Sequence, residues 1–433
     1  MTLNFNGGAL TVDCLEHLRT TDWPDDRLEL VVVDNGSNDG VVDLVRSRWP
    51  EVRVVASATN RGFAGGMNLG LDRLDDIDYV ALVNNDLTVD DGWLAPLVDT
   101  LESDPTLGAA CPKILFATRF LEVEIETSTS RRGRGDHRAL GVRITGIEIG
   151  GGDVIGGVQW WQGFWGPEAS SPSDPVSQWS SGHAVLRVPI GLDAPVPPTL
   201  RVRIQGATAG TAVLRAGGAP KTLHLTTEPA WCEVDIGDEP IEVINNAGSV
   251  LNADGYGADR GYLARDDGTF DTPADVFAWC GAAAVLSTRY LSDIGLFDER
   301  LFLYYEDLEL SWRGRDRGWR YRYVPDVVVR HVHSATTGEH SQLARYQNER
   351  NHLLVLALHA PPRTLLRAAG RSLLVTASYA RRDLLSPALR GDRPSAGIVR
   401  DRVRAFGGFL RLLPAIARER GRTRTETRTA GRV

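Results

Sequence analysis

The sequence lacks the features that mark disulfide-rich, secreted or membrane-spanning proteins. Its four cysteines are far apart and none belongs to a Cys-x-x-Cys pair, which argues against a zinc ribbon or a disulfide scaffold and favours a reducing compartment. No apolar run approaches the roughly 18–20 residues that span a bilayer. The first residues contain neither a basic segment nor an apolar one, so we expect no secretory signal and a cytoplasmic location.

Charge is unevenly distributed along the 433 residues. From Arg363 onward there are 17 basic and 5 acidic residues, a net charge of +12. The preceding 362 residues carry 31 basic and 51 acidic residues, a net charge of −20. An arginine-rich end on an acidic body favours contact with something anionic, and a solvated terminus is the alternative, preferred for the last ten or so residues.

The first 117 residues alternate between strand and helix patterns. Continuous apolar, β-branched runs predict buried strands, and amphipathic segments between them predict helices. This order predicts an α/β fold with a doubly wound parallel sheet that binds ligands at the carboxyl ends of its strands. The strands are expected at Leu28–Val33, Val52–Ala56 and Tyr79–Val83, and the helices at Val41–Trp49, Gly66–Leu74 and Trp93–Leu101.

The first strand of this sheet is short. Only Met1–Leu3 precede the polar segment Asn4–Gly8, whereas a strand usually has about 5–6 residues. Either the chain starts upstream of Met1 or this strand is stunted.

Residues 118–244 interrupt the α/β pattern, which resumes after them. Gly, Pro, Ser and Thr are frequent here, and short alternating apolar runs are typical of an antiparallel β-sandwich. Four tryptophans also lie within twenty residues; we expect them to pack inside the sandwich, with stacking on sugar rings as the alternative. The runs are Leu121–Glu126, Leu140–Ile149, Ala184–Val188, Leu200–Ile204, Thr211–Leu214, Thr222–Leu225 and Cys232–Ile236, and the tryptophans are Trp160, Trp161, Trp165 and Trp179.

From Ser341 the chain becomes helical. The apolar segments Leu353–Leu358 and Leu373–Ala380 are flanked by arginines and are too short to span a membrane. A basic amphipathic helix can lie on an anionic membrane surface or pack against the body of the protein, and the sequence leaves both open.

Polar residues follow the predicted strands. Asp34 ends one strand and Asp86 follows another, so both carboxylates should share the crevice at the sheet edge. Such a carboxylate can accept hydrogen bonds from a base or ribose, or hold Mg²⁺ or Mn²⁺ on a diphosphate; a turn cap is the alternative. Between them, the glycine-rich segment Asn60–Asn68 suits a phosphate or nucleotide edge but matches neither dinucleotide-binding nor P-loop motifs.

Acidic and imidazole side chains recur later in the chain. Glu306 and Asp307 begin a predicted helix, and because they are adjacent their side chains diverge by about 100°. One could face a donor while the other deprotonates an acceptor hydroxyl, or both could only stabilise the helix start. His331 ends the predicted strand Val324–Arg330 and could complete a metal site with Asp86.

Taken together, these motifs resemble family 2 glycosyltransferases of the GT-A fold, in particular their bacterial rhamnosyltransferase-like members. The resemblance covers residues 1–117 and about 245–352. We therefore expect a discontinuous GT-A domain over 1–117 and 245–340, an inserted β-sandwich over 118–244, and a basic helical region over 341–433. The motifs are NFNGG, VVVDNGSNDG, NRGFAGGMNLG, LVNND, CGAA, GLFDERLFLYYEDLELSWR and VRHVHSATTG.

The resemblance implies catalytic and metal-binding roles. Asp307 matches the general base, and Glu306 is its neighbour. Asp86 matches the metal-binding carboxylate of an Asp-x-Asp-like motif whose first Asp is Asn84 here. His331 aligns with a histidine that binds metal in some members, and His333 is an additional one.

Other matched residues are assigned to the substrates. Trp279 and Gly281 fall on the acceptor side, and a Tyr-x-x-x-Arg-Asn element follows the catalytic domain at Tyr346, Arg350 and Asn351. The nucleotide-sugar-binding set is Asn6, Asp34, Asn35, Asn60, Arg61, Gly65, Asn68, Asn85 and Asp86.

The implied activity is transfer of a sugar from a nucleotide diphosphate-sugar to a hydroxyl of a saccharide or lipid-linked saccharide, with inversion. Rhamnose is the sugar of the named subgroup, Mg²⁺ or Mn²⁺ is the expected cofactor, and cell-envelope polysaccharide synthesis is the expected setting. We expect the basic C-terminal region to meet an anionic membrane at its inner face, and we expect no nucleic acid partner.

Two other functions remain open. A sugar-nucleotide nucleotidyltransferase is disfavoured because Asn4–Gly8 contains no basic residue for a phosphate loop. A glycan-binding protein with a decayed transferase domain is disfavoured because the chain keeps Asp86, Glu306, Asp307 and His331.

Overall fold

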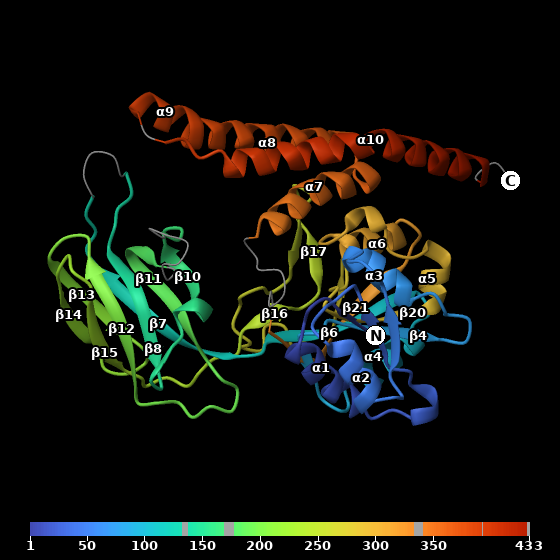
Figure 1. Ribbon diagram of the computed structural model, residues 1–433, viewed down its shortest axis with the longest axis horizontal. Helices are drawn as coiled ribbons and strands as arrows, with labels where there is room; N and C mark the ends of the chain where they lie inside the picture. The colour runs from blue at the N-terminus through green and yellow to red at the C-terminus, as the bar shows by residue number, and fades with distance from the viewer. Residues whose placement is uncertain (132–136, 169–176, 333–340, 392, 431–433) are drawn as a thin grey trace. The chain divides into compact units, whose positions relative to one another are not determined.

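The computed structural model describes residues 1–131, 137–168, 177–332, 341–391 and 393–430. It divides into two compact units (Figure 1). Unit 1 comprises Met1–Leu115, Asn245–Tyr262 and Gly268–Val433. Unit 2 comprises Phe116–Ile244 and Leu263–Asp267, most of it green in Figure 1.

Unit 1 begins with a parallel α/β layer. The strands β1 (Thr2–Asn4), β2 (Val31–Asp34) and β3 (Arg53–Ala56) pair side by side in parallel, with α1 (Ala9–Arg19) and α2 (Val41–Arg48) between them. Strand β4 (Tyr79–Val83) continues this layer through two hydrogen bonds: the amino group of Met1 donates to the carbonyl of Ala81 at 2.8 Å, and the Val83 N–H donates to the carbonyl of Met1 at 3.0 Å. The β1 strand has three residues, so the short first strand is confirmed.

Helix α3 (Gly62–Gly70) begins earlier than the sequence predicted. The prediction of a helix start at Gly66 is wrong because the glycine-rich segment forms the helix itself rather than a turn before it. Small residues are needed here for close packing, since a Cβ on Gly66 would lie 2.6 Å from the Leu3 side chain. The glycines therefore bring α3 against β1.

The second half of unit 1 is a mixed sheet. Its strands lie in the order β19 (Ala274–Val276), β21 (Arg320–His331), β6 (Leu107–Phe116), β20 (Ala283–Ser287) and β4, and β20 runs antiparallel to β4 and β6. The short strand β5 (Leu87–Val89) pairs with β21. The expected α/β fold is confirmed, with its sheet parallel in the first half and mixed in the second. Smaller elements are β16 (Ile244–Asn246), β17 (Ser249–Leu251), β18 (Gly257–Asp259), α4 (Ala95–Ser103), α5 (Thr288–Ile294) and α6 (Glu306–Arg315).

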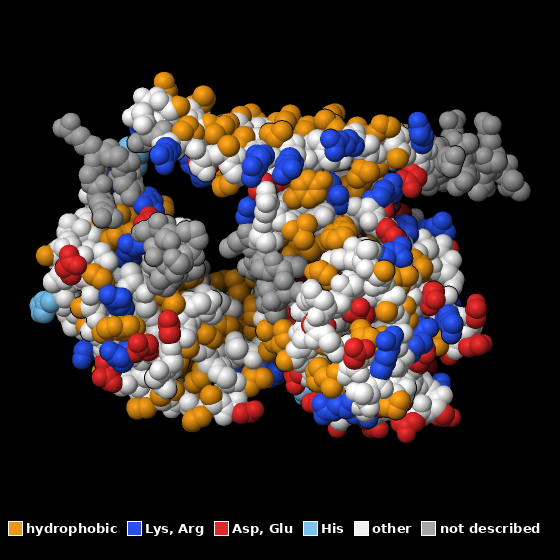
Figure 2. Space-filling view, viewed as in Figure 1, with side chains coloured by type: hydrophobic (Ala, Val, Ile, Leu, Met, Phe, Trp, Pro, Cys, Tyr) orange, Lys and Arg blue, Asp and Glu red, His pale blue; other side chains and the backbone are white. Residues whose placement is uncertain are grey.

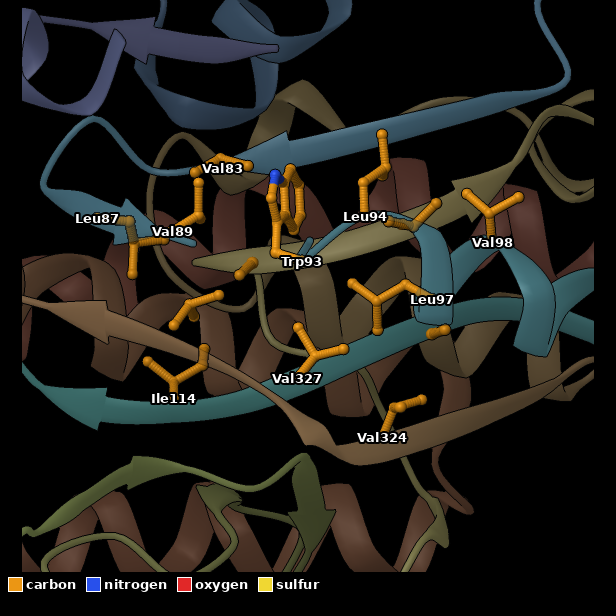
Figure 3. Packing of buried hydrophobic residues seen from close by; sticks show 14 of the residues in the cluster. Val83, Leu87, Val89, Trp93, Leu94, Leu97, Val98, Ile114, Val324 and Val327 are labelled. Atoms are coloured by element: carbon orange, nitrogen blue, oxygen red, sulfur yellow. The ribbon is translucent and has the colours of Figure 1, made fainter. Parts of the chain in front are cut away.

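A hydrophobic core fixes α4 on this mixed sheet. Figure 3 shows Leu97 of α4 close to Val327 of β21, in a buried cluster that also contains Trp93, Leu94, Val98 and Val324. The buried indole of Trp93 keeps its polar atom satisfied, because Nε1 donates to Oγ1 of Thr21 at 3.0 Å. This packing anchors the strands that end at the polar residues described below.

Unit 2 is an antiparallel β-sandwich. Each of the seven predicted runs coincides with a strand, and their inward side chains form one apolar core that includes Val123, Ile144 and Val202. The Trp179 side chain is buried and its Nε1 donates to Glu168, as expected for packing within the unit, whereas Trp160, Trp161 and Trp165 are half-buried. The strands are β7 (Arg119–Thr127), β8 (Val142–Ile149), β9 (Gly152–Asp153), β10 (Gln159–Phe164), β11 (Gln178–Ile190), β12 (Thr199–Gly206), β13 (Gly210–Arg215), β14 (Lys221–Leu225) and β15 (Ala230–Asp235).

The C-terminal part of unit 1 is helical, with α7 (Gln342–His359), α8 (Pro362–Ala380), α9 (Ser386–Arg390) and α10 (Gly397–Ala430). Helix α10 packs on α7, where Phe409 and Ile416 join a core with Leu353. The Arg420 guanidinium donates to two carbonyls at the C-terminal end of α7, those of Ala357 and Ala360, both at 3.0 Å. Over the described ranges, no helix combines the length and apolar character needed to cross a bilayer.

Candidate active site

A cavity of about 440 Å³ lies in unit 1 at the carboxyl ends of β2 and β4. This is the edge where an α/β sheet of this type binds ligands. The cavity brings together residues from both halves of the sequence pattern, as predicted. They are Asn35, Asn60, Asn85 and Asp86 from the first half, and Gly281, Glu306, Asp307 and His331 from the second.

The Asp86 and His331 side chains meet in this cavity. Nε2 of His331 lies 3.1 Å from Oδ1 of Asp86, and both side chains are buried. On the opposite side of the ring, Nδ1 lies 3.0 Å from Oδ1 of Asn245. A side-chain amide at this position orients the imidazole, as outer contacts of metal-binding histidines do. His333, the additional histidine in the sequence, lies outside the described residues.

These two side chains fit a divalent ion that takes its other ligands from a substrate. Neighbouring ligands of an octahedral ion with bonds of 2.0–2.1 Å are about 3 Å apart, close to the separation of the two atoms. In the part of the chain that the structure describes, no cluster of three or more His, Cys, Asp or Glu is placed to hold a metal. Such an ion would therefore need oxygen atoms from a bound phosphate, which is typical of Mg²⁺ sites.

Two opposing effects set the pKa of the Asp307 carboxyl group. Its burial raises the pKa of the carboxyl group to about 6, and nearby Asp259 acts in the same direction. Two backbone donors oppose this: the Gly281 N–H donates to Oδ2 at 2.8 Å, and the Leu308 N–H donates to Oδ1 at 2.7 Å. A carboxylate of this kind is ionised near neutral pH and basic enough to accept a proton.

Glu306 differs from its neighbour although both begin α6. Burial raises the pKa of its carboxyl group well above the usual value, and the charge of Asp307 raises it further. Its Oε2 atom is buried without a hydrogen-bond partner in the described structure, and the residue lines the cavity. Burial and the neighbouring charge therefore both favour the neutral form of Glu306, whereas the backbone donors of Asp307 favour its ionised form.

Asn35 holds the glycine-rich segment beside the cavity. Its Nδ2 donates to Oδ1 of Asn60 at 3.0 Å and to the carbonyl of Gly62 at 2.9 Å, and its Oδ1 accepts from the Arg61 N–H at 2.9 Å. Every polar atom of this amide is therefore engaged in shaping the loop. Asn35 therefore holds the loop that borders the cavity.

Several predicted site residues do not line this cavity. Asp34 is buried, and its carboxylate accepts from Nδ2 of Asn4 at 3.2 Å and from the Ser37 N–H at 3.3 Å. Arg61 forms an ion pair with Glu299, and Trp279 is fully buried beside Phe297. The residues that the structure does not bring to the cavity are Asn6, Asp34, Arg61, Gly65, Asn68 and Trp279.

The structure also adds residues that the sequence did not indicate. Asn245 orients His331, and Asp259 lies close enough to affect Asp307. Both come from the segment where the chain returns to unit 1. No motif or strand-end pattern marked either position, so only their placement in space identifies them.

The backbone before Asp307 is held in a strained turn. Tyr304 and Tyr305 have φ angles of 67° and 74°, a left-handed conformation that costs about 1–2 kcal/mol for a residue with a Cβ. Nδ2 of Asn351 donates to the carbonyls of Leu303 and Tyr304 at 2.8 and 2.7 Å, and Asn351 is fully buried. Helix α7 thus stabilises the turn that presents Glu306 and Asp307.

Arg350 and α3 support the same turn. The Arg350 guanidinium donates to the carbonyl of Arg300 at 2.6 Å and to Oδ1 of Asn351 at 2.9 Å. The Phe63 N–H donates to the carbonyl of Phe302 at 2.6 Å, and a Cβ on Gly62 would lie 2.1 Å from that oxygen. Gly62, with a φ of 73°, is therefore required for this close approach.

We expect Asn351→Ala to destabilise the protein, because two carbonyls of a strained turn lose their donor. The free energy of unfolding should fall by roughly 2–3 kcal/mol, measured by urea denaturation. Asn348→Ala is the matched control, since Asn348 lies on the same helix and is exposed. Equal effects of the two substitutions would contradict a role of Asn351 in holding the turn.

The family model described as glycosyl transferase family 2 matches residues 2–142. This segment contains β1 to β7 and the polar residues at the ends of β2 and β4. No curated protein matches the chain.

Solved structures similar to this chain include three proteins in complex with a nucleotide or nucleotide sugar. GalNAc-T7 with UDP, GalNAc and Mn²⁺ is 13% identical over 82% of this chain and 47% of its own, with a TM-score of 0.44. Mannosyltransferase PcManGT from Pyrobaculum calidifontis, with GDP-Man and Mn²⁺, is 14% identical over 94% and 85%, with a TM-score of 0.40. S. aureus TarS 1–349 with UDP is 20% identical over 26% and 34%, with a TM-score of 0.24.

The chain spans about half the length of GalNAc-T7, and TM-scores below 0.5 carry no argument about activity. The family model and the α/β architecture are therefore the informative findings. The structure has the α/β fold that the sequence predicted, and the glycosyl transferase family 2 model matches the part of the chain that supplies Asn35, Asn85 and Asp86.

Proposed function

We propose that this protein is a metal-dependent inverting glycosyltransferase that moves a sugar from a nucleotide diphosphate-sugar to a hydroxyl of a saccharide or lipid-linked saccharide. The observation that carries the proposal is that two kinds of side chain share one cavity: a carboxylate that can act as a base, and a pair that can hold a metal. A basic carboxylate, Asp307, lies in the same cavity as the Asp86–His331 pair, which suits a metal-bound diphosphate. Rhamnose as the sugar and cell-envelope polysaccharide as the product follow from the sequence resemblance alone.

The roles of the residues follow from their environments. Asp307 accepts the proton of the acceptor hydroxyl as that oxygen attacks the anomeric carbon, and one base is enough for a single displacement with inversion. Glu306, whose neutral form is favoured by burial, donates a hydrogen bond to a sugar hydroxyl. Asp86 and His331 would hold the metal, which neutralises the leaving diphosphate. The loop positioned by Asn35 borders the donor.

A panel of nucleotide sugars tests the proposal and separates it from its alternatives. We expect one nucleotide diphosphate-sugar to bind and to be hydrolysed slowly, with binding weakened by EDTA and by Asp86→Asn. Binding and hydrolysis are measured by calorimetry and by release of the nucleotide diphosphate. Formation of a nucleotide sugar from a sugar phosphate would indicate a nucleotidyltransferase, and glycan binding without any donor binding would indicate a decayed enzyme.

Asp307→Asn should lower kcat by roughly 10²–10⁴-fold and leave donor affinity within a few-fold, because the base acts on the acceptor. Glu306→Gln is the matched control: it keeps a neutral hydrogen-bond donor, so its loss should be much smaller. Since Asp307 must be ionised to act, kcat/KM should fall as the pH drops through about 6. Similar losses in the two variants, or a pH profile flat across this range, would reject the assignment.

We also propose that the C-terminal helices rest on an anionic membrane surface. Figure 2 shows hydrophobic and basic side chains together along α8 and α10. Seven large apolar side chains between Leu366 and Leu410 are between 49% and 88% exposed, and each basic residue near an anionic leaflet adds about 1 kcal/mol of attraction. The exposed side chains are Leu366, Leu373, Leu374, Leu385, Leu389, Val403 and Leu410.

The full chain should float with phosphatidylglycerol vesicles at low salt and be released at high salt. Replacing Leu366, Leu373 and Leu374 together by Gln should weaken binding at least roughly tenfold, since each leucine loses the gain of leaving water. Leu44→Gln, an exposed leucine on α2, is the control and should bind as the wild type does. Unchanged flotation of the triple variant would remove α8 from the membrane contact.

A further inference from the structure

A second cavity, of about 680 Å³, lies between α7 and α10 and borders the candidate active site. Leu343 of α7 lines both cavities and is 45% exposed. The remaining walls come from one face of each helix. They include Gln342 and Tyr346 of α7, and Arg404, Gly408 and Arg411 of α10.

The floor of this cavity is open because α10 has two consecutive glycines. Gly407 and Gly408 both line it, and a Cβ on Gly408 would lie 2.6 Å from the Tyr346 hydroxyl oxygen. The Tyr346 ring is in turn held by the Arg350 guanidinium, 5.4 Å from its centroid. The hydroxyl-bearing edge of Tyr346 and bare helix backbone therefore form a fixed, polar floor.

Two arginines give the cavity its charge. Arg404 and Arg411 are seven residues apart on α10, so their side chains share one face of the helix two turns apart. Both are exposed, and across the described residues neither takes part in an ion pair. Neighbouring arginines are committed: Arg402 pairs with Glu349, and Arg345 pairs with Asp401.

The single carboxylate of the cavity is also neutralised. Asp401 accepts from Nε2 of Gln342 at 2.5 Å and from the Arg345 guanidinium at 3.2 Å. The net charge presented by the lining is therefore positive. Guanidinium groups bind phosphate oxygens with paired hydrogen bonds, which makes a phosphate ester a suitable ligand.

We propose that this cavity binds the phosphate or diphosphate group of a lipid-linked saccharide acceptor. In such an acceptor this group joins the lipid to the saccharide. The inference rests on the proposed function. With its phosphate at Arg404 and Arg411, the acceptor's saccharide passes Leu343 toward Asp307. Val403, 57% exposed at the cavity wall, offers apolar contact to the lipid.

Binding of farnesyl diphosphate to the full-length protein in EDTA tests the proposal, because EDTA suppresses metal-dependent binding at the donor site. Arg404→Gln with Arg411→Gln should weaken this binding at least tenfold, measured by calorimetry. Arg400→Gln with Arg418→Gln is the matched control: both residues are exposed on α10, lie outside the cavity, and remove the same charge. The control pair should change the affinity less than twofold.

Equal losses in the two pairs, or no loss in either, would overturn the proposal. Phosphatidylglycerol vesicles separate the two sources of phosphate. Suppose that replacing Arg404 and Arg411 weakens vesicle binding more than the control substitutions do but leaves the binding of farnesyl diphosphate unchanged. The cavity then binds lipid headgroups, and the proposal fails. Donor binding is measured in the same preparations: its absence in the wild type overturns sugar transfer, whereas intact donor binding with arginine-independent farnesyl diphosphate binding overturns only the acceptor site.

Discussion

The candidate active site depends on a backbone turn that is unfavourable by itself. Two consecutive tyrosines, Tyr304 and Tyr305, adopt left-handed angles immediately before Glu306 and Asp307. Strain of this kind persists only where the surrounding structure supports it. The support comes from Asn351 on α7 and from the Phe63 N–H on α3, which lie far apart in the sequence. The position of the proposed base at the start of α6 is therefore set by contacts of this turn with α3 and α7.

The same turn separates the chemistry of two adjacent carboxyl groups. Asp307 faces the Gly281 and Leu308 N–H groups, which stabilise its negative charge, whereas Glu306 points into a region where its Oε2 has no donor. Burial raises the pKa of both carboxyl groups; the Gly281 and Leu308 N–H groups oppose this rise at Asp307, and at Glu306 only its own backbone N–H does so. When the environments of two carboxyl groups push their pKa values apart, one group is suited to act as an acid and the other as a base. Their adjacency in the sequence hides a difference that only the fold creates.

Local patterns predicted much of this fold, and the misses have physical causes. The runs that became β4 and β21, the start of α6 at Glu306, and the approach of Asp86 to His331 could be predicted, because strand ends and helix starts have local signals. The start of α3 was misplaced because glycines serve packing there as well as turns. Asn245 and Asp259 were missed because long-range return of the chain, and no local motif, brings them to the cavity. Trp279, assigned to the acceptor side from its motif, is fully buried beside Phe297, because a motif does not indicate which way a side chain points.

The C-terminal helices show why the two interpretations of a basic amphipathic region need not exclude each other. Apolar side chains of α7 and α10, such as Leu353 and Phe409, are buried, while those of α8, such as Leu374, remain exposed. The arginines divide similarly: Arg371 pairs with Asp254 and Arg402 with Glu349, but in the described ranges Arg404 and Arg411 keep their charge unpaired. Ion pairs within unit 1 therefore neutralise only part of the net positive charge of this region. The remaining charge lies beside the α7–α10 cavity and along the exposed apolar side chains, so the helices that support the turn before Asp307 also carry the groups on which the proposed acceptor and membrane contacts rest.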